Sequence, residues 1–467
     1  MWLTPLESIA SPLEAALRLA STPGLAWLDG GLTHGQDGRF SFVASVPCEV
    51  LERAPGASSP LALLDQLSAA HDTPGEYELP PERVPLWVGH VAYDAVDPTS
   101  RAHPPGGVAV AASSAEASST VSLAVASTTG SAEASTLGSA EASTPCIRFA
   151  RYDAWCAFDH QTGRAFLVGD DERACAALQQ RLRAQPAAPE ELQFSAGAVQ
   201  VPPRAQHRTA VEEALGLIRE GELYEINLTR RFRAPFTGSA LGLFLRMRER
   251  SPVPLGYFVD AGTHAILGRS MERFLRFDVH SRVLSTTPIK GTLARAGDDL
   301  SEADQLASDP KERAEHAMVV DLMRNDLSRV CTVGSVEVSE LMAVYPFAGL
   351  SHLVSTVQGV ARADVTLRTL LEQTFPPGSV TGAPKVRVMR AIAALERVPR
   401  GVYTGCMGFV DRSGGCSFAV AIRTALVADG VVDYFSGGGI VSASDPEREC
   451  DETELKAALF LRSLAGN

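Results

Sequence analysis

The chain lacks the features that mark secreted, membrane or zinc-binding proteins. Its eight cysteines form no CxxC pair and no cluster with zinc spacing, which is typical of buried thiols in a reducing compartment. The N-terminus has no basic segment followed by an apolar one, so it does not read as a secretory signal. No run of residues approaches the length of a membrane span. We therefore expect a soluble, cytoplasmic protein.

Positive charge is also scarce. The sequence contains 42 Lys and Arg against 55 Asp and Glu, for a net charge of −13 and a pI near 5.3. Nucleic acids and anionic membranes bind basic surfaces, so neither is an expected partner. The GxGxxG and GxxxxGK[ST] motifs of nucleotide-binding loops are absent too. An anionic small molecule would need a local site made of a few cationic side chains or a metal ion.

Local composition divides the chain into two regions. Residues 1–190 mix strand-like runs with a few helical stretches, and from about 106 to 145 they contain an Ala/Ser/Thr-rich insertion with three SAEAS repeats. Such a segment cannot bury enough apolar surface to offset its ordering entropy, so we predict a disordered loop. After a Pro/Ala linker, residues 200–464 carry mixed helices and strands, which favour an α+β architecture with helices outside the sheets.

Hydrophobic periodicity and capping residues place the individual elements. Helices are predicted at 61–70, 171–184, 207–220, 239–250, 310–327, 366–374, 384–397 and 446–464. Strands are predicted at 224–233, 255–260, 264–268, 273–286, 334–342, 352–359, 405–412, 416–427 and 431–436, and two more around a turn at 161–163.

Lys290 stands in the stretch LSTTPIKGTLARAG. The apolar and β-branched residues before it predict a strand, which Pro288 and Gly291 are expected to end. A lysine at such a position is usually a solvated surface charge. The alternative is a nucleophile, and the residues elsewhere in the chain must decide between the two.

Two predicted helices carry paired carboxylates. Glu312 and Glu315 are three residues apart and share a helix face, and Glu449, Glu452 and Lys456 follow one another at i, i+3 and i+7. Two helices that each offer two carboxylates can hold Mg²⁺, a hard cation that prefers oxygen ligands. Solvated helix faces with intrahelical salt bridges are the alternative for each pair.

Other polar residues fall at the ends of predicted strands. Glycines 437–439 are expected to end a strand and to offer N–H groups to an anion, unless they form only a sheet turn. Arg423 ends an apolar strand, where a guanidinium needs a carboxylate partner. His352 begins a strand, Tyr403 lies in a turn and Glu272 follows a Gly-Arg turn. Together these residues indicate a Mg²⁺-assisted enzyme that acts on a small carboxylate.

In this order the segments resemble the chorismate-utilising enzymes, which include anthranilate, aminodeoxychorismate, isochorismate and salicylate synthases. The resemblance implies a layered α/β/β/α sandwich, with an N-terminal region of the anthranilate synthase component I type at 1–190 and a chorismate-binding catalytic domain at 200–464. The matching stretches are YEINLTRRF, SMERF, TTPIKGT, KERAEHAMVVDLMRNDLSRV, HLVST, GSVTGAPKVRVM, YTGCMGF, AIRT, GGGIV and DPEREC.

The resemblance also implies roles for the candidate residues. Glu272 would be the general acid that protonates the departing 4-hydroxyl of chorismate, and His352 would face the ring. The implied ligands of Mg²⁺ are Glu315 and Glu452, with Glu312 and Glu449 binding directly or through water. The implied contacts to the two substrate carboxylates are Arg423, Tyr403, Ser379, Gly437, Gly438, Gly439 and Lys456.

Within this family the position of Lys290 distinguishes two products. The resemblance implies that anthranilate synthases have alanine there, whereas in aminodeoxychorismate synthases the lysine attacks carbon 2 and ammonia then displaces it from carbon 4. We therefore expect 4-amino-4-deoxychorismate, a precursor of p-aminobenzoate and folate, with nearby cations lowering the pKa of the lysine so that it is neutral. Anthranilate synthase component I, from tryptophan biosynthesis, is the alternative, and a non-catalytic regulator that binds chorismate or tryptophan is a third.

Two further expectations concern partners. The chain has no GxCxG nucleophile motif, so the resemblance implies a separate glutamine amidotransferase subunit that supplies ammonia. The N-terminal stretch WLDGG departs from the LLES element by which anthranilate synthases bind tryptophan, which argues against feedback by that amino acid.

Overall fold

A computed structural model gives the fold and describes residues 1–30, 38–67, 69, 84–96, 144–294, 308–347 and 350–465. The insertion predicted at about 106–145 lies almost entirely outside the described residues. In the part of the chain that is described, no helix combines the length and the apolar character that crossing a membrane requires.

The first sheet has twelve described strands, all paired antiparallel. Their order is β1-β8-β7-β3-β2-β11-β12-β21-β22-β10-β18, and β9 pairs with β10 at the side of this path. The strands are β1 (Trp2–Pro5), β2 (Ala26–Asp29), β3 (Phe40–Ala44), β7 (Ala154–Asp159), β8 (Arg164–Gly169), β9 (Phe194–Ala196), β10 (Glu225–Gly238), β11 (Leu255–Asp260), β12 (His264–Ser270), β18 (Gly382–Ala383), β21 (Thr424–Ala428) and β22 (Val431–Ile440).

The second sheet has ten described strands, again antiparallel. Their order is β15-β17-β14-β13-β20-β19-β5-β6-β4, and β16 also pairs with β17. The strands are β4 (Glu49–Arg53), β5 (Pro85–Val91), β6 (Ile147–Arg151), β13 (Arg273–Phe277), β14 (Val283–Thr287), β15 (Ile289–Ala294), β16 (Glu337–Phe347), β17 (Leu350–Val360), β19 (Cys406–Asp411) and β20 (Cys416–Val420). Both sheets contain strands from each half of the chain, and the division into 1–190 and 200–464 stays a prediction.

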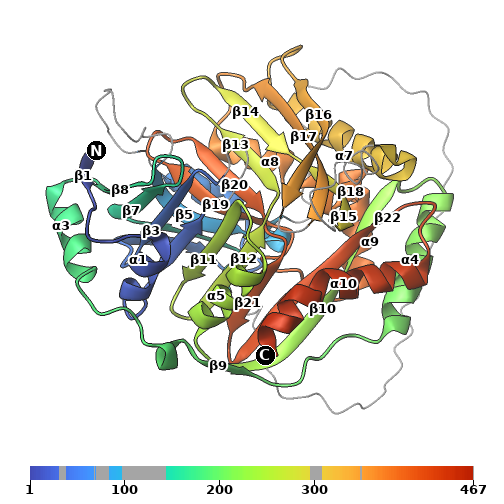
Figure 1. The fold of residues 1–467 in the computed structure, drawn as a ribbon. Coiled ribbons are helices and arrows are strands. Elements are labelled where there is room, and N and C mark those ends of the chain that lie inside the picture. Colours follow the sequence, from blue (N-terminus) through green and yellow to red (C-terminus); the bar gives the residue numbers. More distant parts are fainter. Residues whose placement is uncertain are drawn as a thin grey trace.

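Helices cover the outer faces of the two sheets, so the predicted α/β/β/α sandwich is confirmed (Figure 1). Helices α1, α3, α5 and α10 share a buried core with the first sheet, α7 and α8 share another with the second, and a third core lies between the sheets. The helices are α1 (Pro12–Leu19), α3 (Glu172–Arg181), α4 (Arg204–Arg219), α5 (Ala240–Arg250), α7 (Pro310–Ser328), α8 (Leu367–Thr374), α9 (Lys385–Glu396) and α10 (Pro446–Leu464).

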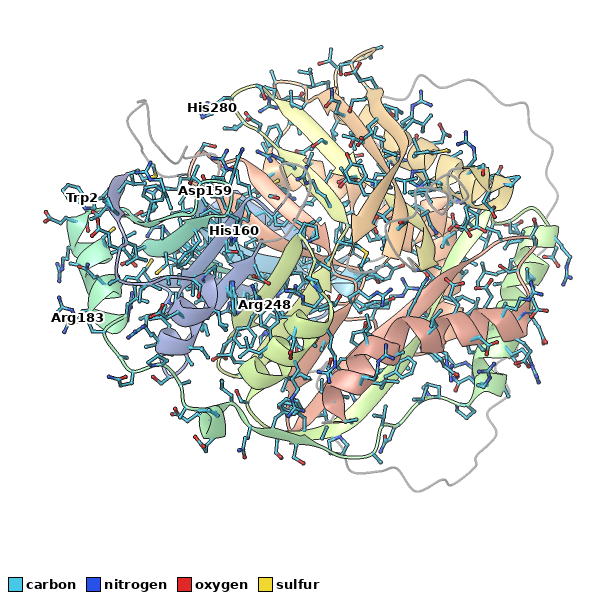
Figure 2. The ribbon with its side chains drawn as sticks, in the orientation of Figure 1. Trp2, Asp159, His160, Arg183, Arg248 and His280 are labelled. Atoms are coloured by element: carbon cyan, nitrogen blue, oxygen red, sulfur yellow. The ribbon has the colours of Figure 1, made fainter. Side chains whose placement is uncertain are left out.

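The predicted strand at 273–286 is instead a hairpin, β13 and β14. The side chain of Asp278 makes the turn, because its Oδ1 accepts hydrogen bonds of 2.9 Å from the backbone N–H groups of His280 and Ser281. His280 lies at the tip of this hairpin (Figure 2). The segment around the turn at 161–163 also holds three strands, β6, β7 and β8, where two were predicted.

The predicted strand at 416–427 is broken as well, into β20 and β21. Arg423 stands at the break with a φ of +51°, in the left-handed region that a continuous strand does not use. Glycines 437–439, which were expected to end a strand, lie inside β22 instead. Both differences matter for the site, because they fix the direction of Arg423 and place the three glycines in a paired backbone.

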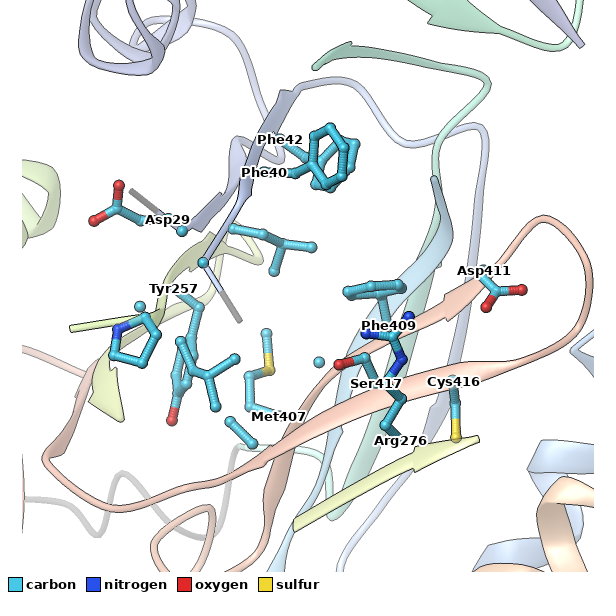
Figure 3. Close-up of a pocket in the computed structure, with 18 of the residues that line it drawn as sticks. Asp29, Phe40, Phe42, Tyr257, Arg276, Met407, Phe409, Asp411, Cys416 and Ser417 are labelled. Atoms are coloured by element: carbon cyan, nitrogen blue, oxygen red, sulfur yellow. The ribbon is translucent and has the colours of Figure 1, made fainter. Parts of the chain in front are cut away.

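A cavity of about 110 Å³ lies between the two sheets (Figure 3). Phe40, Phe42 and Tyr257 line it from the first sheet, and Met407 and Phe409 line it from the second. At its edge, Asp29 accepts hydrogen bonds from Arg248 at 2.9 Å and from Arg269 at 2.7 Å. None of the residues predicted for catalysis, substrate binding or metal binding lines this cavity.

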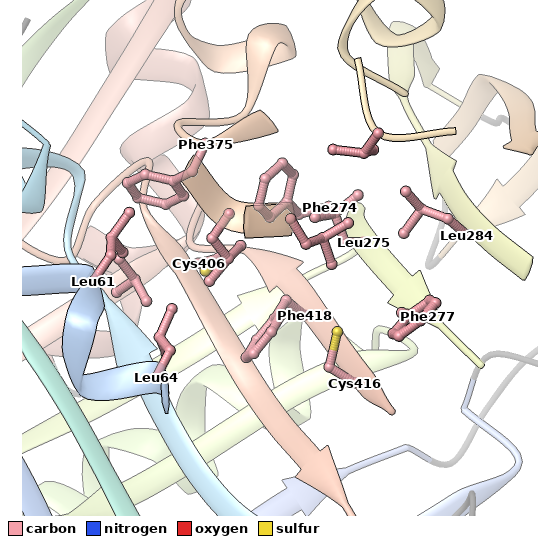
Figure 4. Close-up of a cluster of buried hydrophobic side chains, with 14 of the residues drawn as sticks. Leu61, Leu64, Phe274, Leu275, Phe277, Leu284, Phe375, Cys406, Cys416 and Phe418 are labelled. Atoms are coloured by element: carbon pink, nitrogen blue, oxygen red, sulfur yellow. The ribbon is translucent and has the colours of Figure 1, made fainter. Parts of the chain in front are cut away.

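The core of the second sheet anchors α7, the helix that carries Glu312 and Glu315. Aromatic side chains of β13 and β20, including Phe274 and Phe418, pack in this core with Phe375, which follows α8 (Figure 4). A buried ion pair adds to it, since Lys385 at the start of α9 contacts Asp326 of α7 at 2.6 Å. The same ammonium donates to the carbonyl oxygen of Thr374 at 2.7 Å, so α7, α8 and α9 are joined at one point.

Removal of the Asp326 carboxylate is expected to destabilise the fold strongly. In Asp326→Ala the Lys385 ammonium stays buried without its counter-charge, which costs about 3–5 kcal/mol in the free energy of unfolding. Asp321→Ala is the matched control, because Asp321 is exposed on the same helix and pairs with Arg324 at the surface; a loss of at most about 1 kcal/mol is expected there. Urea-induced unfolding measures both, and equal losses would contradict this role for the buried pair.

Candidate functional site

Lys290 lies inside the edge strand β15, not in a turn after a strand as predicted. The ladder resumes directly after Pro288, and Lys290 pairs with Leu353 of β17 before a bulge. The Lys290 side chain is 18% exposed, and its Nζ donates a hydrogen bond of 2.9 Å to Oε1 of Glu225, which is buried. Lys290 is therefore one half of a largely buried ion pair and not a solvated surface charge.

Gly439 provides the space for this ion pair. In the ladder between β22 and β10, Gly439 pairs with Asn227, two residues along from Glu225. A Cβ atom at Gly439 would lie 2.5 Å from Oε1 of Glu225 and 3.1 Å from Nζ of Lys290. Any other residue at this position would displace the pair, so the close approach of two charged side chains requires glycine here.

The surroundings of Lys290 raise its pKa, whereas we expected nearby cations to lower it. Burial lowers the pKa, but the charge and hydrogen bond of Glu225, together with the charges of Glu315 and Glu272, outweigh that effect. Lys290 is therefore an ammonium in this structure. A nucleophilic role requires that its proton be removed first.

Glu272 lies between β12 and β13, close to Lys290. Burial raises the pKa of its carboxyl to about 7, although the Ser379 hydroxyl and the Lys290 ammonium both lower it. Ser379 comes from the short 3₁₀ turn at Gly378–Val380 and is itself buried. A carboxyl group with a pKa near neutral pH can give up a proton and take it back.

The stripe of charged residues on α10 lies against the glycines of β22. A Cβ atom at Gly438 would lie 3.1 Å from Oε2 of Glu449 and 3.4 Å from Oε1 of Glu452. Lys456 contacts Oε1 of Glu452 at 2.5 Å and donates to the carbonyl oxygen of Gly437 at 3.0 Å. The glycines thus leave room for charged side chains on both sides of the strand.

The second carboxylate pair lies at the start of α7, where Glu312 and Glu315 are both partly buried. The charge of Glu315 acts on Lys290. The next residue, His316, is buried and shares a hydrogen bond of 2.7 Å with Ser355. Burial and the Lys290 charge lower the pKa of His316 to about 4, so its ring is neutral near pH 7.

The carboxylates of α7 and α10 have the donor chemistry that Mg²⁺ prefers. Consecutive residues of a strand face opposite sides, so the α10 acids beside Gly438 and the ion pair beside Gly439 lie on opposite sides of β22. Among the described residues, no three His, Cys, Asp or Glu side chains form a group that could hold a metal ion. These carboxylates are ligands of the type that a hard cation prefers. That they bind one ion together stays a prediction.

Arg423 lies next to the α10 stripe, whereas Tyr403 lies on the other side of β22. Nη1 of Arg423 donates a hydrogen bond of 2.7 Å to the carbonyl oxygen of Lys456, where we expected a carboxylate partner. Tyr403 stacks on Phe435, with ring centroids 5.3 Å apart. Burial raises the pKa of the Tyr403 hydroxyl, and the charge of Arg423 is among those that oppose the shift. Tyr434, the residue before Phe435, stacks on Phe460 of α10, so Phe435 and Tyr403 face the opposite side of β22.

His352 is buried near the start of β17. The register sets it opposite Thr292 of β15 and Tyr345 of β16, one residue before Leu353, the partner of Lys290. His352 and Lys290 therefore occupy adjacent rungs of one ladder.

Glu225 is the residue of this site that the sequence analysis missed. It appeared only as part of the matching stretch YEINLTRRF. The signal was present, because Glu225 begins a strand in which Ile226 and Leu228 are buried, and a carboxylate on a buried strand needs a partner. The sequence could not name that partner, since Lys290 is 65 residues away along the chain.

Comparison with known proteins defines the class. The sequence profile of the family described as chorismate binding enzyme matches residues 109–462. The chain belongs to this family. A crystal structure of anthranilate synthase component I from Streptococcus pneumoniae has a TM-score of 0.72 and 27% identity, over 98% of this chain and 99% of that one. The isochorismate synthase MenF from Escherichia coli shares the fold, with a TM-score of 0.69 at 19% identity.

Curated relatives carry two different names. An aminodeoxychorismate synthase from Streptomyces pristinaespiralis is 40% identical over 262 residues, which are 56% of this chain and 36% of that protein. Aminodeoxychorismate synthase component 1 from Escherichia coli is 38% identical over 56% of this chain and 58% of its own length. Anthranilate synthase component 1 from Archaeoglobus fulgidus is 37% identical over 69% of this chain and 76% of its own. The chain thus spans about a third of the Streptomyces relative.

Proposed function

We propose that this chain is component I of an aminodeoxychorismate synthase, which converts chorismate and ammonia into 4-amino-4-deoxychorismate. The observation that carries the proposal is Lys290, a largely buried amine that lies against Glu225 and near the protonatable Glu272. A lysine that is largely buried does not act as a solvated surface charge. In the family pattern described above, the anthranilate-forming enzymes have alanine at this position.

In the proposed reaction, the neutral amine of Lys290 attacks carbon 2 of chorismate. Both conjugated ring double bonds shift, and the 4-hydroxyl leaves as water after Glu272 has given it a proton. Ammonia then adds at carbon 4, and the amine of Lys290 departs from carbon 2 as both double bonds shift back. The raised pKa of Glu272 supports the acid role, because a large share of the group is protonated near neutral pH.

Two carboxylates of chorismate need counter-charges. We assign this task to residues around the glycines of β22, with His352 facing the ring. The proposed carboxylate-binding residues are Arg423, Tyr403, Ser379, Gly437, Gly438, Gly439 and Lys456. Mg²⁺, held by Glu315 and Glu452 with help from Glu312 and Glu449, would neutralise the ring carboxylate.

We assign the supply of ammonia to a glutamine amidotransferase subunit. Several relatives are named component 1 of their synthase, which supports a second subunit.

The test is a product assay on the purified chain with chorismate, Mg²⁺ and ammonium. We expect a product that yields p-aminobenzoate after addition of aminodeoxychorismate lyase, and no anthranilate fluorescence. Omission of Mg²⁺ is expected to abolish turnover, which separates the enzymatic product from spontaneous decay of chorismate. Anthranilate fluorescence without p-aminobenzoate would assign the chain to the anthranilate branch, and binding of chorismate without turnover, with the amidotransferase present, would favour a regulatory protein.

A further inference from the structure

Glu225 is the side chain in direct contact with the reacting atom of Lys290. Its Oε1 lies 2.9 Å from Nζ, and the carboxylate is 5% exposed. Among the described residues, the Lys290 side chain donates its hydrogen bond to Glu225. Gly439 leaves both groups open toward the glycine strand, because no side chain there covers them.

We propose that Glu225 is the general base that takes the proton from Lys290 when chorismate binds. The inference rests on the proposed function. It assigns to Glu225, which has no role in that scheme, the deprotonation that makes Lys290 a nucleophile. Nζ carries a proton along the hydrogen bond to Oε1, so transfer needs no movement of heavy atoms and no intervening water.

The other charged groups near Lys290 leave this task to Glu225. Glu315 from α7 and Glu272 act on the lysine through their charges, but neither hydrogen-bonds to Nζ. His316 from α7 is held by Ser355 and also feels the charge of the lysine. Glu272 is reserved for the 4-hydroxyl in the proposed reaction. A second carboxylate is therefore needed, one that is ionised when the lysine is protonated.

The proton balance of the cycle then closes within the site. Glu225 first receives the proton of the Lys290 ammonium, and the neutral amine bonds to carbon 2 while Glu272 protonates the departing hydroxyl. Ammonia bonds to carbon 4, the bond between Nζ and carbon 2 breaks, and the proton of the new ammonium goes to Glu272. Glu225 returns its proton to the freed amine. The net reaction is chorismate plus ammonia to 4-amino-4-deoxychorismate plus water.

The test compares Glu225→Gln with the unmodified enzyme in the formation of the covalent adduct. Ammonia is left out, because its own ionisation changes with pH. Adduct on the Lys290 peptide is followed by mass spectrometry after acid quench, with saturating chorismate and Mg²⁺ between pH 6.5 and 9.5. Dividing the variant rate by the unmodified rate at each pH removes the effect of Glu272, which both proteins share.

We expect this ratio to be about 10⁻² or lower at pH 7, as for loss of a general base, and to rise with pH as solvent hydroxide takes over the deprotonation. Glu222→Gln is the matched control: Glu222 is exposed, pairs with Arg387 and lies three residues before Glu225. Its ratio is expected to stay near one. Glu225→Asp keeps a carboxylate, so its rate falls but its ratio is expected to be independent of pH.

A ratio at or above one for Glu225→Gln across this range would overturn the inference. It would mean that burial alone neutralises the lysine and that Glu225 is only a counter-charge. Should Glu225→Gln fail to fold, a ratio that climbs with pH in Glu225→Asp would overturn it equally. These results leave the proposed function standing, whereas absence of any adduct in the unmodified enzyme removes the covalent mechanism and this inference with it.

Discussion

Replacement of Lys290 by alanine is expected to lower the formation of 4-amino-4-deoxychorismate by on the order of 10³-fold or more. The expected loss is large because the variant has no amine to form the proposed covalent intermediate, and the remaining residues can only position chorismate and ammonia for direct substitution. The measurement is the rate of p-aminobenzoate formation in the coupled assay, at an ammonia concentration that does not saturate.

Lys290→Arg is the control that separates charge from nucleophilicity. A guanidinium preserves the ion pair with Glu225 but does not lose a proton in a protein, so it cannot attack carbon 2. We expect it to be as inactive as the alanine variant while unfolding at a similar urea concentration to the unmodified chain. An alanine variant that makes normal amounts of product without excess ammonia would rule out the covalent role.

A Glu272 variant incubated with chorismate tests the proposed adduct directly. Its adduct is expected to form more slowly, because the acid of the first step is missing, and then to persist, because the same group is missing from the second half of the proposed reaction. Mass spectrometry without borohydride is expected to show the added mass on the peptide that contains Lys290. The same mass on a peptide with another lysine would contradict the assignment.

Local sequence signals predicted most helices of the fold, but they missed α1, and the helix predicted at 61–70 is a 3₁₀ helix at Pro60–Gln66. The predicted bounds 446–464 agree with α10, because Asp445 caps the helix through the N–H groups of Glu447 and Arg448 and Pro446 suits its first turn. The strand predictions failed where a single side chain redirects the backbone. Asp278 turns one predicted strand into a hairpin, and Arg423 adopts a left-handed conformation that breaks another. Apolar periodicity continues through both points, so it could not reveal either break.

The sequence could nominate the candidate site residues but not the contacts between them. The spacing of Glu449, Glu452 and Lys456 gave a common helix face from sequence alone. The contact of Lys290 with Glu225 depends on two strands in different sheets, so only the tertiary structure supplies it. That pairing also reverses the expected direction of the lysine pKa. The error arose because the prediction considered the cations of the site and omitted a carboxylate at hydrogen-bond distance.

The small number of lysines in the chain also bears on the role of Lys290. The chain has four lysines, at positions 290, 311, 385 and 456, among 42 Lys and Arg. At exposed positions arginine serves as well as lysine, so a lysine kept in an arginine-rich chain points to a place where a compact ammonium is needed. Lys385 is buried against Asp326, Lys456 contacts Glu452, and Lys290 contacts Glu225. Lys290 is the one of these three that also lies near a protonatable carboxyl, Glu272.

Glu272→Gln is expected to lower turnover by about 10²- to 10⁴-fold, the usual contribution of a general acid, while chorismate still binds. Glutamine has the shape of the neutral acid and no proton to give. Glu337→Gln is the matched control, since Glu337 is exposed and its Oε1 accepts a hydrogen bond from Gln358 on the neighbouring strand. A loss of turnover in the control as large as in Glu272→Gln would mean that the effect is not specific to the buried carboxyl.

The rate of adduct formation is expected to depend on pH through the ionisation of Glu272. Burial raises the pKa of Glu272 from its usual value to about 7, so the acid form that the first step needs is complete below that pH and is lost as pH rises through it. The rate of adduct formation in the unmodified enzyme is therefore expected to fall above pH 7, by up to tenfold per pH unit. In Glu272→Gln this descending limb should vanish, because nothing is left to ionise. A limb that survives the substitution unchanged would show that another group is the acid, and Glu272 would then be a neutral carboxyl that only shapes the pocket.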